Sequence, residues 1–343
     1  MSRHPTSSPP SQRDGVLAPH PPPRRGRAAL PLRIGTRASP LALVQTRMFM
    51  ARLVSFCPVL KAAEAFEEHA ITTTGDAVQD RSLVDIGGKG LFAKEIHEAL
   101  ADGRVDFAVH SLKDLETALP DGIVLACCMT REDARDALIL GPRCGVPDAA
   151  DPFAAIPPGA VIGTASVRRA AQLLHRRPDL RPALIRGNVA TRIAKVRAGV
   201  VDATFLAYAG LRRLGLEREA ALVIDAAMMV PAACQGIVGV TVRAADTELH
   251  DLLSGIEDPE AAAVSRAERA MLAALDGSCR TPIGGHATLG ADGTLHLTGL
   301  VARPDGSFLL HRAISGAPVD AEALGRTLGD SLRRDSPADI FQP

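Results

Sequence analysis

The sequence has no excess of charge of either sign, because 39 Lys and Arg residues balance 39 Asp and Glu residues among 343. A protein that binds a polyanion such as nucleic acid over a broad surface usually carries a positive excess. The balance therefore predicts no nucleic-acid partner, and any site for anions must be local.

A run of about 18 apolar residues, the length that a helix needs to cross a bilayer, is also missing. Hydrophobic residues make up 46% of the chain and charged residues 23%, which are values typical of globular proteins. We therefore expect neither a membrane-spanning protein nor a membrane partner.

Three kinds of site lack their sequence signature. The six Cys residues include no C-x-x-C pair and no His-rich spacing, so no metal site is predicted. No G-x-G-x-x-G follows an expected strand, and Gly87-Gly88-Lys89-Gly90 lacks the spacer and the Ser or Thr of a phosphate-binding loop. The cysteine pattern fits a reducing cytoplasm, where we expect the protein to reside.

Residues 1–30 are rich in Pro, Ser and Arg, with Asp14 the only acid, and they show no apolar periodicity. Such a segment cannot bury enough apolar surface to fold, so we expect a disordered N-terminal extension. It has no continuous apolar stretch of the kind found in a signal peptide. A wrongly assigned start codon would explain the segment equally well.

From Pro31 onward, short apolar strands alternate with helices. Strands are expected at 32–34, 105–110, 160–163 and 203–207, and the periodicity between them predicts βαβ units with mainly parallel sheets. The expected fold class is therefore α/β.

Two internal echoes occur within this region. IGTRAS (34–39) resembles IGTASVRR (162–169), and 89–110 resembles 186–207, each reading basic residue and Gly, helix, Gly-x-Val-Asp, strand. The echoes predict two similar domains rather than one large domain. Any strand–helix–strand unit shares part of this pattern, so a single larger domain stays open on these grounds alone.

After Pro259 the pattern changes. A helix is expected near 261–275, followed by alternating segments joined at Asp292-Gly293 and Asp305-Gly306, and then a helix near 321–332. Asp-Gly between alternating segments is a hairpin signal. This region is expected to form a small α+β domain.

Basic residues concentrate at the expected strand-to-helix junctions. Helix N-terminal N–H groups and guanidinium groups both bind carboxylate or phosphate oxygens, so the junctions predict anion binding. Most arginines are solvated surface residues, and any single member is weak evidence. The set comprises Arg37 with Ser39, Lys89, Arg168 with Arg169, Arg186, Arg192 and Arg213.

Two further residues stand out. Asp114 follows an expected buried strand, where ligands of parallel sheets bind, and it could stabilise a developing cation or cap the following turn. Cys279 lies in a loop with turn formers on both sides, although a lone Cys is more often an inert small hydrophobe than a nucleophile.

From about Leu32 onward, nine segments in order resemble the hydroxymethylbilane synthase (porphobilinogen deaminase) family. They are IGTRASPLAL (34–43), GGKGLFAKEIHEAL (87–100), AVHSLKD (108–114), REDARDAL (131–138), IGTASVRRAAQL (162–173), RGNVATRI (186–193), LAYAGLRRLGL (206–216), PAACQG (231–236) and the loop around Cys279.

The resemblance implies two domains similar to the type II periplasmic-binding fold, joined by hinges, and a small C-terminal α+β domain. The active cleft would lie between the first two domains. Because the chain of such proteins crosses to the second domain and returns, the expected domains are 31–130 with 237–254, then 131–236, then 255–343.

The resemblance also implies a transferase of heme biosynthesis, acting without metal or nucleotide. Four porphobilinogen molecules would be deaminated and joined head to tail on a dipyrromethane primer, and water would release linear hydroxymethylbilane. The primer would be a covalent cofactor, attached through a thioether to Cys279.

Roles for single residues follow from the same resemblance. Asp114 would be the catalytic acid, which stabilises the cationic azafulvene formed as ammonia leaves. Cofactor contacts are expected from Lys113, Asp114, Ser166, Arg168, Arg169 and Cys279. Substrate contacts are expected from Arg37, Ser39, Lys89, Arg186, Gly187, Asn188, Arg192, Arg213 and Gln235.

Three positions depart from the family pattern: Glu116 replaces a Pro, Ala165 replaces a Ser, and Cys234 replaces a Gly. They keep an inactive paralogue open as an alternative. A non-catalytic periplasmic-type anion-binding protein is a second alternative, which would require neither Asp114 nor Cys279. For the enzyme we expect a monomer that binds porphobilinogen and the growing pyrrole chain, and whose product passes to uroporphyrinogen-III synthase.

Overall fold

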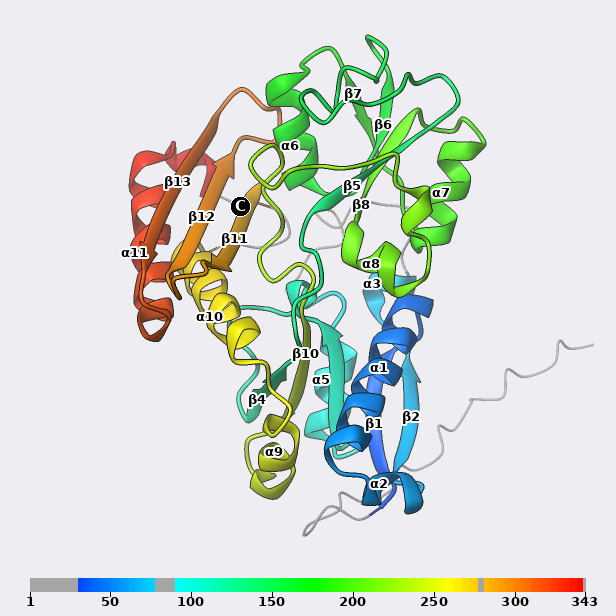
Figure 1. Ribbon diagram of the computed structural model, residues 1–343, viewed down its shortest axis with the longest axis vertical. Coiled ribbons are helices and arrows are strands. Elements are labelled where there is room, and N and C mark those ends of the chain that lie inside the picture. The colour runs from blue at the N-terminus through cyan, green and yellow to red at the C-terminus, as the bar shows by residue number, and fades with distance from the viewer. Residues whose placement is uncertain (1–29, 78–89, 277–280, 342–343) are drawn as a thin grey trace, which may run out of the picture.

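The computed structural model describes residues 30–77, 90–276 and 281–341, and this part of the chain contains three sheets with their helices (Figure 1). The expected N-terminal extension, apart from its last residue, lies outside the described residues. Lys89 and Cys279 lie outside them as well. No helix among the described residues is both long and apolar enough to cross a membrane.

The first sheet brings together strands that are far apart in the sequence. Its central strand positions are filled by apolar residues such as Ile34, Phe107 and Val240, which are fully buried. Phe107 meets Phe49 of a covering helix edge to face, with ring centroids 5.7 Å apart. In spatial order the strands are β2 (Phe66–Ile71), β1 (Leu32–Arg37), β3 (Phe107–Ser111), β10 (Val238–Arg243) and β4 (Ile123–Cys128).

The second sheet has the same topology as the first. One parallel pair of strands has the same offset in both sheets: Ile34 lies opposite Phe107 in one sheet, and Ile162 lies opposite Ala203 in the other. The two echoed segments therefore occupy equivalent places, as the repeat predicts. In spatial order its strands are β7 (Arg181–Ala183), β6 (Val161–Gly163), β8 (Ala203–Ala207), β5 (Asp136–Leu140) and β9 (Leu222–Val223).

Each five-stranded sheet is mainly parallel, as expected, with one strand reversed. Strand β10 runs antiparallel to both of its neighbours in the first sheet, and β5 does so in the second. These are the strands that the chain enters after crossing from the other sheet. The two crossing segments lie side by side, since Glu132 donates its backbone N–H to the carbonyl of Gly236 at 3.1 Å.

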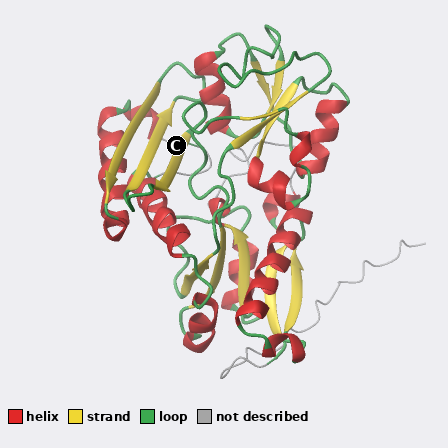
Figure 2. Ribbon diagram, in the orientation of Figure 1, coloured by secondary structure: helices red, strands yellow, loops and turns green. Residues whose placement is uncertain are grey.

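The sheets are covered by helices, visible in Figure 2 as the red ribbons around the yellow arrows. Several begin at a side-chain cap, and Pro40 and Pro259 occupy first-turn positions where a missing N–H costs nothing. The helices of the two α/β parts are α1 (Pro40–Phe56), α2 (Val59–Ala62), α3 (Thr74–Ala77), α5 (Lys94–Ala101), α6 (Val167–Arg176), α7 (Val189–Arg197), α8 (Tyr208–Arg213) and α9 (Thr247–Ser254).

The C-terminal part is an antiparallel sheet of β11 (Ile283–Leu289), β12 (Leu295–Ala302) and β13 (Leu309–Gly316). Both predicted Asp-Gly hairpins are confirmed, and their glycines have positive φ, 78° at Gly293 and 76° at Gly306. Helices α10 (Pro259–Ala274) and α11 (Ala321–Asp335) pack against this sheet and against each other. The predicted fold class, two α/β domains with a small α+β domain, is confirmed.

Candidate functional site

The carboxyl end of β1 carries a guanidinium between two carboxylates. Arg37 donates from Nε and Nη2 to the two oxygens of Asp76, at 3.0 and 2.5 Å, and from Nη1 to Oδ2 of Asp114 at 3.2 Å. Its guanidinium also lies over the ring of Phe92, 4.2 Å from the centroid. The burial of Asp76 opposes its ionisation, but hydrogen bonds from Arg37 and Thr73 outweigh this and hold its pKa below the usual value.

Asp114 lies at the end of the neighbouring strand. It closes a single 3-10 turn, Leu112–Asp114, that follows β3, and its side chain is about one-quarter exposed. Because β1 and β3 are parallel neighbours, their carboxyl ends bring Arg37 and Asp114 together although 77 positions separate them. Asp114 is therefore held by Arg37, and both residues were candidates from the sequence.

Three predicted site residues are helix N-caps. Ser39 Oγ accepts the backbone N–H of Ala42 at the start of α1, and Ser166 Oγ accepts that of Arg169 at the start of α6. Asn188 Oδ1 accepts the N–H of Thr191 at the start of α7. A Ser hydroxyl that accepts such a bond keeps its own proton for donation, so capping leaves Ser39 and Ser166 able to bind a carboxylate.

The first turn of α6 holds two buried arginines on one buried acid. Arg168 Nη2 donates to Oδ2 of Asp136 at 2.8 Å, and Arg169 Nη2 donates to Oδ1 of the same carboxylate at 2.7 Å. Their other hydrogen bonds go to the backbone carbonyls of Val230 and Phe205. Burial opposes ionisation of Asp136, yet the two guanidinium groups hold its pKa far below the usual range.

A hydrogen-bonded chain joins this cluster to the residue before Asp114. Gln235 Nε2 donates to Oδ1 of Asp136 at 2.8 Å, and Gln235 Oε1 accepts from Nζ of Lys113 at 3.2 Å. Burial lowers the pKa of Lys113 to about 8, with Asp114 opposing the shift and Arg169 adding to it. Residues of both α/β parts therefore meet at this place.

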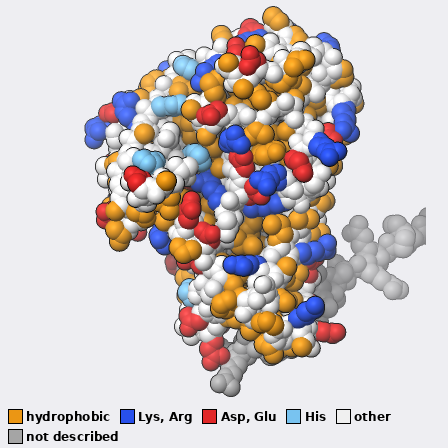
Figure 3. All heavy atoms as spheres, viewed as in Figure 1, with side chains coloured by type: hydrophobic (Ala, Val, Ile, Leu, Met, Phe, Trp, Pro, Cys, Tyr) orange, Lys and Arg blue, Asp and Glu red, His pale blue; other side chains and the backbone are white. Residues whose placement is uncertain are grey.

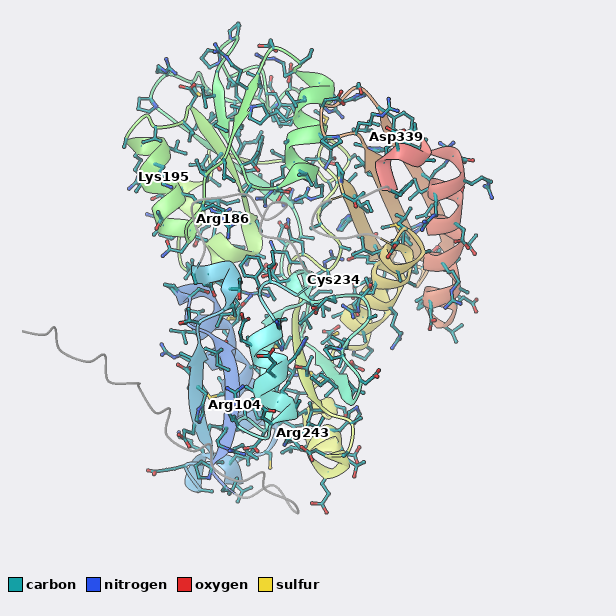
Figure 4. The ribbon with its side chains drawn as sticks, turned by 180° about the vertical axis from the view of Figure 1, so that it is seen from behind. Arg104, Arg186, Lys195, Cys234, Arg243 and Asp339 are labelled. Carbon is teal, nitrogen blue, oxygen red and sulfur yellow. The ribbon has the colours of Figure 1, made fainter. Side chains whose placement is uncertain are left out.

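Further cations come from the segment before α7 and from α7 itself. Arg186 Nη2 donates to the carbonyl of Gly75 in the first α/β part at 2.8 Å, and Figure 4 shows Arg186 at the level where the two parts meet. Gly187 has a φ of 115°, and a Cβ there would lie 2.8 Å from Thr191. Arg192 Nε donates to the carbonyl of Gly187 at 2.9 Å, and burial with the charges of Arg169 and Arg186 lowers its pKa to about 10.

Most of the predicted residues among the described ones lie close together, whereas Arg213 lies at the margin of this group. Arg192 interacts electrostatically with Arg37, Asp114, Arg169 and Arg186, which places the two halves within range of each other. Arg213 instead contacts the crossing segment, donating to the carbonyl of Gly236 at 2.6 Å. Figure 3 shows charges of both signs interspersed on the visible face, in keeping with the overall charge balance.

The sequence did not single out the acids that hold these arginines. Asp76 follows β2 closely, and Asp136 opens β5 within REDARDAL, a motif already crowded with charge. The available signal at Asp136 is an acid at the head of an otherwise apolar strand, DALIL, all but the last of whose residues are buried. A charge in that position requires a partner, since burying it alone is costly.

Two of the positions that depart from the family pattern, Cys234 and Glu116, make contacts with the C-terminal part. Cys234 has a φ of 62°, a left-handed conformation that favours the Gly of the family pattern, and its backbone N–H donates to the buried Glu268. The backbone carbonyl of Glu116 accepts from Arg269 of α10 at 2.7 Å. Glu116 thus ties the segment after Asp114 to the C-terminal part.

Comparison with protein families matches residues 32–251 to the porphobilinogen deaminase dipyromethane cofactor binding domain and residues 262–334 to the porphobilinogen deaminase C-terminal domain. Relatives named porphobilinogen deaminase include that of Paracoccus denitrificans, 46% identical over 91% of this chain and 96% of the relative. The relative from Synechococcus elongatus is 44% identical over 91% of this chain and 95% of its own length.

Solved structures overlap less well. The VFT2 domain of BvgS from Bordetella pertussis aligns with 68% of this chain and 91% of its own, at a TM-score of 0.40 and 14% identity. The strand order described above, rather than this overlap, defines the two α/β parts.

Proposed function

Because the chain belongs to the porphobilinogen deaminase family, we propose that Asp114 is its catalytic carboxylate and that the cations around it hold carboxylate groups. The activity is hydroxymethylbilane synthesis, a transferase reaction of tetrapyrrole biosynthesis, with porphobilinogen as substrate and dipyrromethane as cofactor. The family resemblance seen in the sequence is confirmed, and the non-catalytic anion-binding protein is not favoured.

The observation that carries the assignment is the placing of one accessible acid among cations. Asp114 receives a hydrogen bond from Arg37 at 3.2 Å and interacts electrostatically with Lys113 and Arg192. Since Asp76 holds the other edge of Arg37, the guanidinium is fixed and in turn orients the carboxylate. A fixed negative charge at that point stabilises positive charge on a pyrrole ring as ammonia leaves, at no cost of reorganisation.

The remaining cations suit a substrate that brings carboxylates with every ring. We propose that Arg37, Ser39, Lys89, Arg186, Gly187, Asn188, Arg192, Arg213 and Gln235 bind the substrate side chains. Guanidinium groups pair with carboxylates in two parallel hydrogen bonds, which fixes ring orientation as well as charge.

The described residues also fit the cofactor. The Nε group of Arg169 is buried without a partner among the described residues, which leaves a donor for an anionic group. We propose that Lys113, Asp114, Ser166, Arg168 and Arg169 contact the dipyrromethane and that Cys279 attaches it through a thioether. When bound, the dipyrromethane supplies the ring carbon to which new pyrroles are joined.

We propose the domain division 31–130 with 237–254, 131–236, and 255–343. It is supported by β10 and α9, which pack with the strands of the first sheet although they follow the whole second sheet in the chain.

A cytoplasmic location is supported by the five described cysteines, none of which forms a disulfide. We further propose a monomer that passes its product to uroporphyrinogen-III synthase, which light scattering and a coupled assay would test.

Incubation of the purified protein with porphobilinogen tests the assignment and separates an enzyme from an inactive paralogue. We expect linear hydroxymethylbilane as product, and an intact mass increased by one dipyrromethane, mapped by peptide analysis to Cys279. Cys279→Ala should lack the adduct, whereas Cys57→Ala, the matched control at a half-buried cysteine, should keep it. An unmodified wild-type protein from cells that make porphobilinogen, or an adduct in Cys279→Ala, would refute the attachment.

A further inference from the structure

Asp136 is a carboxylate with no exposed surface that binds three side chains from two different segments. Arg168 and Arg169 each occupy one of its oxygens, at 2.8 and 2.7 Å, and the amide of Gln235 donates to Oδ1 at 2.8 Å. Arg168 and Arg169 belong to α6, whereas Gln235 belongs to the segment that crosses between the two α/β parts. The acid thus joins a helix of one part to the connection between both.

The amide of Gln235 has only one orientation compatible with these contacts. Its Nε2 donates to Asp136 and to the carbonyl of Ala134 at 2.7 Å, so Oε1 must point the other way. There it accepts from Nζ of Lys113 at 3.2 Å. Gln235 is fully buried, and the chain Asp136–Gln235–Lys113 therefore has a fixed direction.

Charge in this cluster is unbalanced. Arg168, Arg169 and Lys113 supply three cations, and Asp136 is the buried anion among them. Two guanidinium groups on one carboxylate leave a positive excess, which suits a site for carboxylates but would be unstable without the acid at its centre.

We propose that Asp136 is a positioning residue of the site, which holds Arg168 and Arg169 directly and Lys113 through Gln235 as one charged unit beside Asp114. The carboxylates of the pyrrole chain then meet cations whose positions are already fixed, and less ordering is required on binding. This inference rests on the proposed function for its purpose, but its geometry concerns residues of this chain alone.

The pKa of Lys113 is a measurable property that depends on whether Asp136, Gln235 and the two arginines are held together as proposed. The groups that act on Lys113 electrostatically are Asp114 beside it, Asp136 across Gln235, and the two arginines of α6. Both acids favour its protonated form, and both arginines oppose it. Removing the charge of Asp136 therefore lowers the pKa of Lys113, and adding a carboxylate at Gln235 raises it.

The test is the pH dependence of Lys113 methylation by formaldehyde and a borane reductant, which requires the neutral amine and is followed by peptide mass spectrometry. In the full-length protein we expect Asp136→Asn to move the midpoint down by about one pH unit and Gln235→Glu to move it up by a similar amount. Asp133→Asn is the matched control, because it removes the same charge three positions away from an acid whose side-chain ion pair is with Arg135. Its midpoint should equal that of the wild type.

Equal midpoints in all four proteins, or shifts of one sign in Asp136→Asn and Gln235→Glu, would refute the proposal. If Asp136→Asn fails to fold, the Gln235→Glu midpoint decides, since that variant keeps both arginine pairs. Turnover of the wild type is measured in parallel. An inactive wild type would count against the proposed function, whereas the methylation midpoints would still decide the role of Asp136.

Discussion

The two α/β parts present the same strand-to-helix turn with opposite charge balance. In the first, one arginine faces two acids, and the side chains of Arg37, Asp76 and Asp114 are 22%, 24% and 27% exposed. In the second, two arginines face one acid, and the side chains of Arg168, Arg169 and Asp136 are 6%, 8% and 0% exposed. Equivalent backbone therefore supports an accessible acid on one side and a buried cationic pair on the other.

The difference indicates that the two α/β parts have different tasks in the reaction. An accessible carboxylate can act on a ring that carries developing positive charge, whereas a buried positive excess attracts carboxylates from a distance. Variants that remove one charge at a time should separate these two tasks.

Asp114→Asn should have the largest effect, because it removes the charge that acts only during reaction while keeping the shape of the side chain. We expect turnover to fall by about 10²–10⁴-fold, with the dipyrromethane adduct and the melting temperature nearly unchanged. Asp121→Asn, at an exposed acid in the following turn, is the control and should be as active as the wild type. Near-native turnover in Asp114→Asn would show that the catalytic assignment is wrong.

Arg168→Leu and Arg37→Leu should lower the free energy of unfolding by different amounts. Arg168→Leu breaks a fully buried pair and should lower the free energy of unfolding by about 2 kcal/mol or more. Arg37→Leu breaks a partly exposed pair, and its loss should be about 1 kcal/mol or less. Urea denaturation measures both, and the reverse order would contradict the difference in burial described above.

As the pH falls, the first α/β part should lose stability at a higher pH than the second α/β part does. His110 is buried beside His97, with ring centroids 5.7 Å apart, and burial with the neighbouring His97 and Arg37 lowers its pKa to about 3. Because this value is below that of an unfolded His, the unfolded chain takes the proton first, and stability is lost as the pH falls from about 6.5 toward 3. The loss should be about 2 kcal/mol by pH 5.

In the second part, the lowered pKa of Asp136 has its effect only at lower pH, since its stabilising contribution begins to be lost as the pH falls below the usual Asp range. Hydrogen exchange at pH 7 and pH 5, corrected for intrinsic rates, should therefore show β3 losing protection before β8. His110→Gln should reduce this difference, and His296→Gln, at an exposed histidine of β12, should leave it unchanged. Earlier loss of protection in β8 would contradict the prediction.

The smallest effect is expected in the connection between the two parts. Ala is normally preferred to Gly by the backbone, but at a φ of 62° the order should reverse. Cys234→Gly should be more stable than Cys234→Ala by about 1 kcal/mol, although both lose the buried thiol. Thermal unfolding of the two variants decides this, and a more stable Ala variant would mean that the backbone adjusts without strain.

Much of this arrangement could be predicted from local sequence. The apolar runs of β1, β3 and β8 predict buried strands, the Asp-Gly pairs predict both hairpins of the C-terminal part, and the echoed motifs predict two like domains. These features depend on residues close together in the chain, where periodicity and turn preferences are informative.

The partners of the charged residues could not be predicted in the same way. Asp136 meets residues 32, 33 and 99 positions away, whereas Asp133 pairs with Arg135 two positions on. The apolar strand that Asp136 opens indicates that this acid needs a partner, but it does not indicate which residues those partners are. Pairing of this kind depends on which strand ends the fold brings together. The family resemblance identifies residues that contact ligand, but it does not identify the acid that holds them.

The strand order of the first sheet also sets the order in which the molecule can form during synthesis. Among the described strands, β4 is hydrogen-bonded to β10 alone, and the first residue of β10, Val238, comes 110 positions after Cys128, the last of β4. At ribosomal rates this interval lasts roughly 5 to 20 seconds, during which β4 has no strand to pair with. All five strands of the second sheet emerge within it. The second α/β part can therefore fold first on the ribosome, and the first sheet gains β10, its last strand to be synthesised, only after the chain has returned.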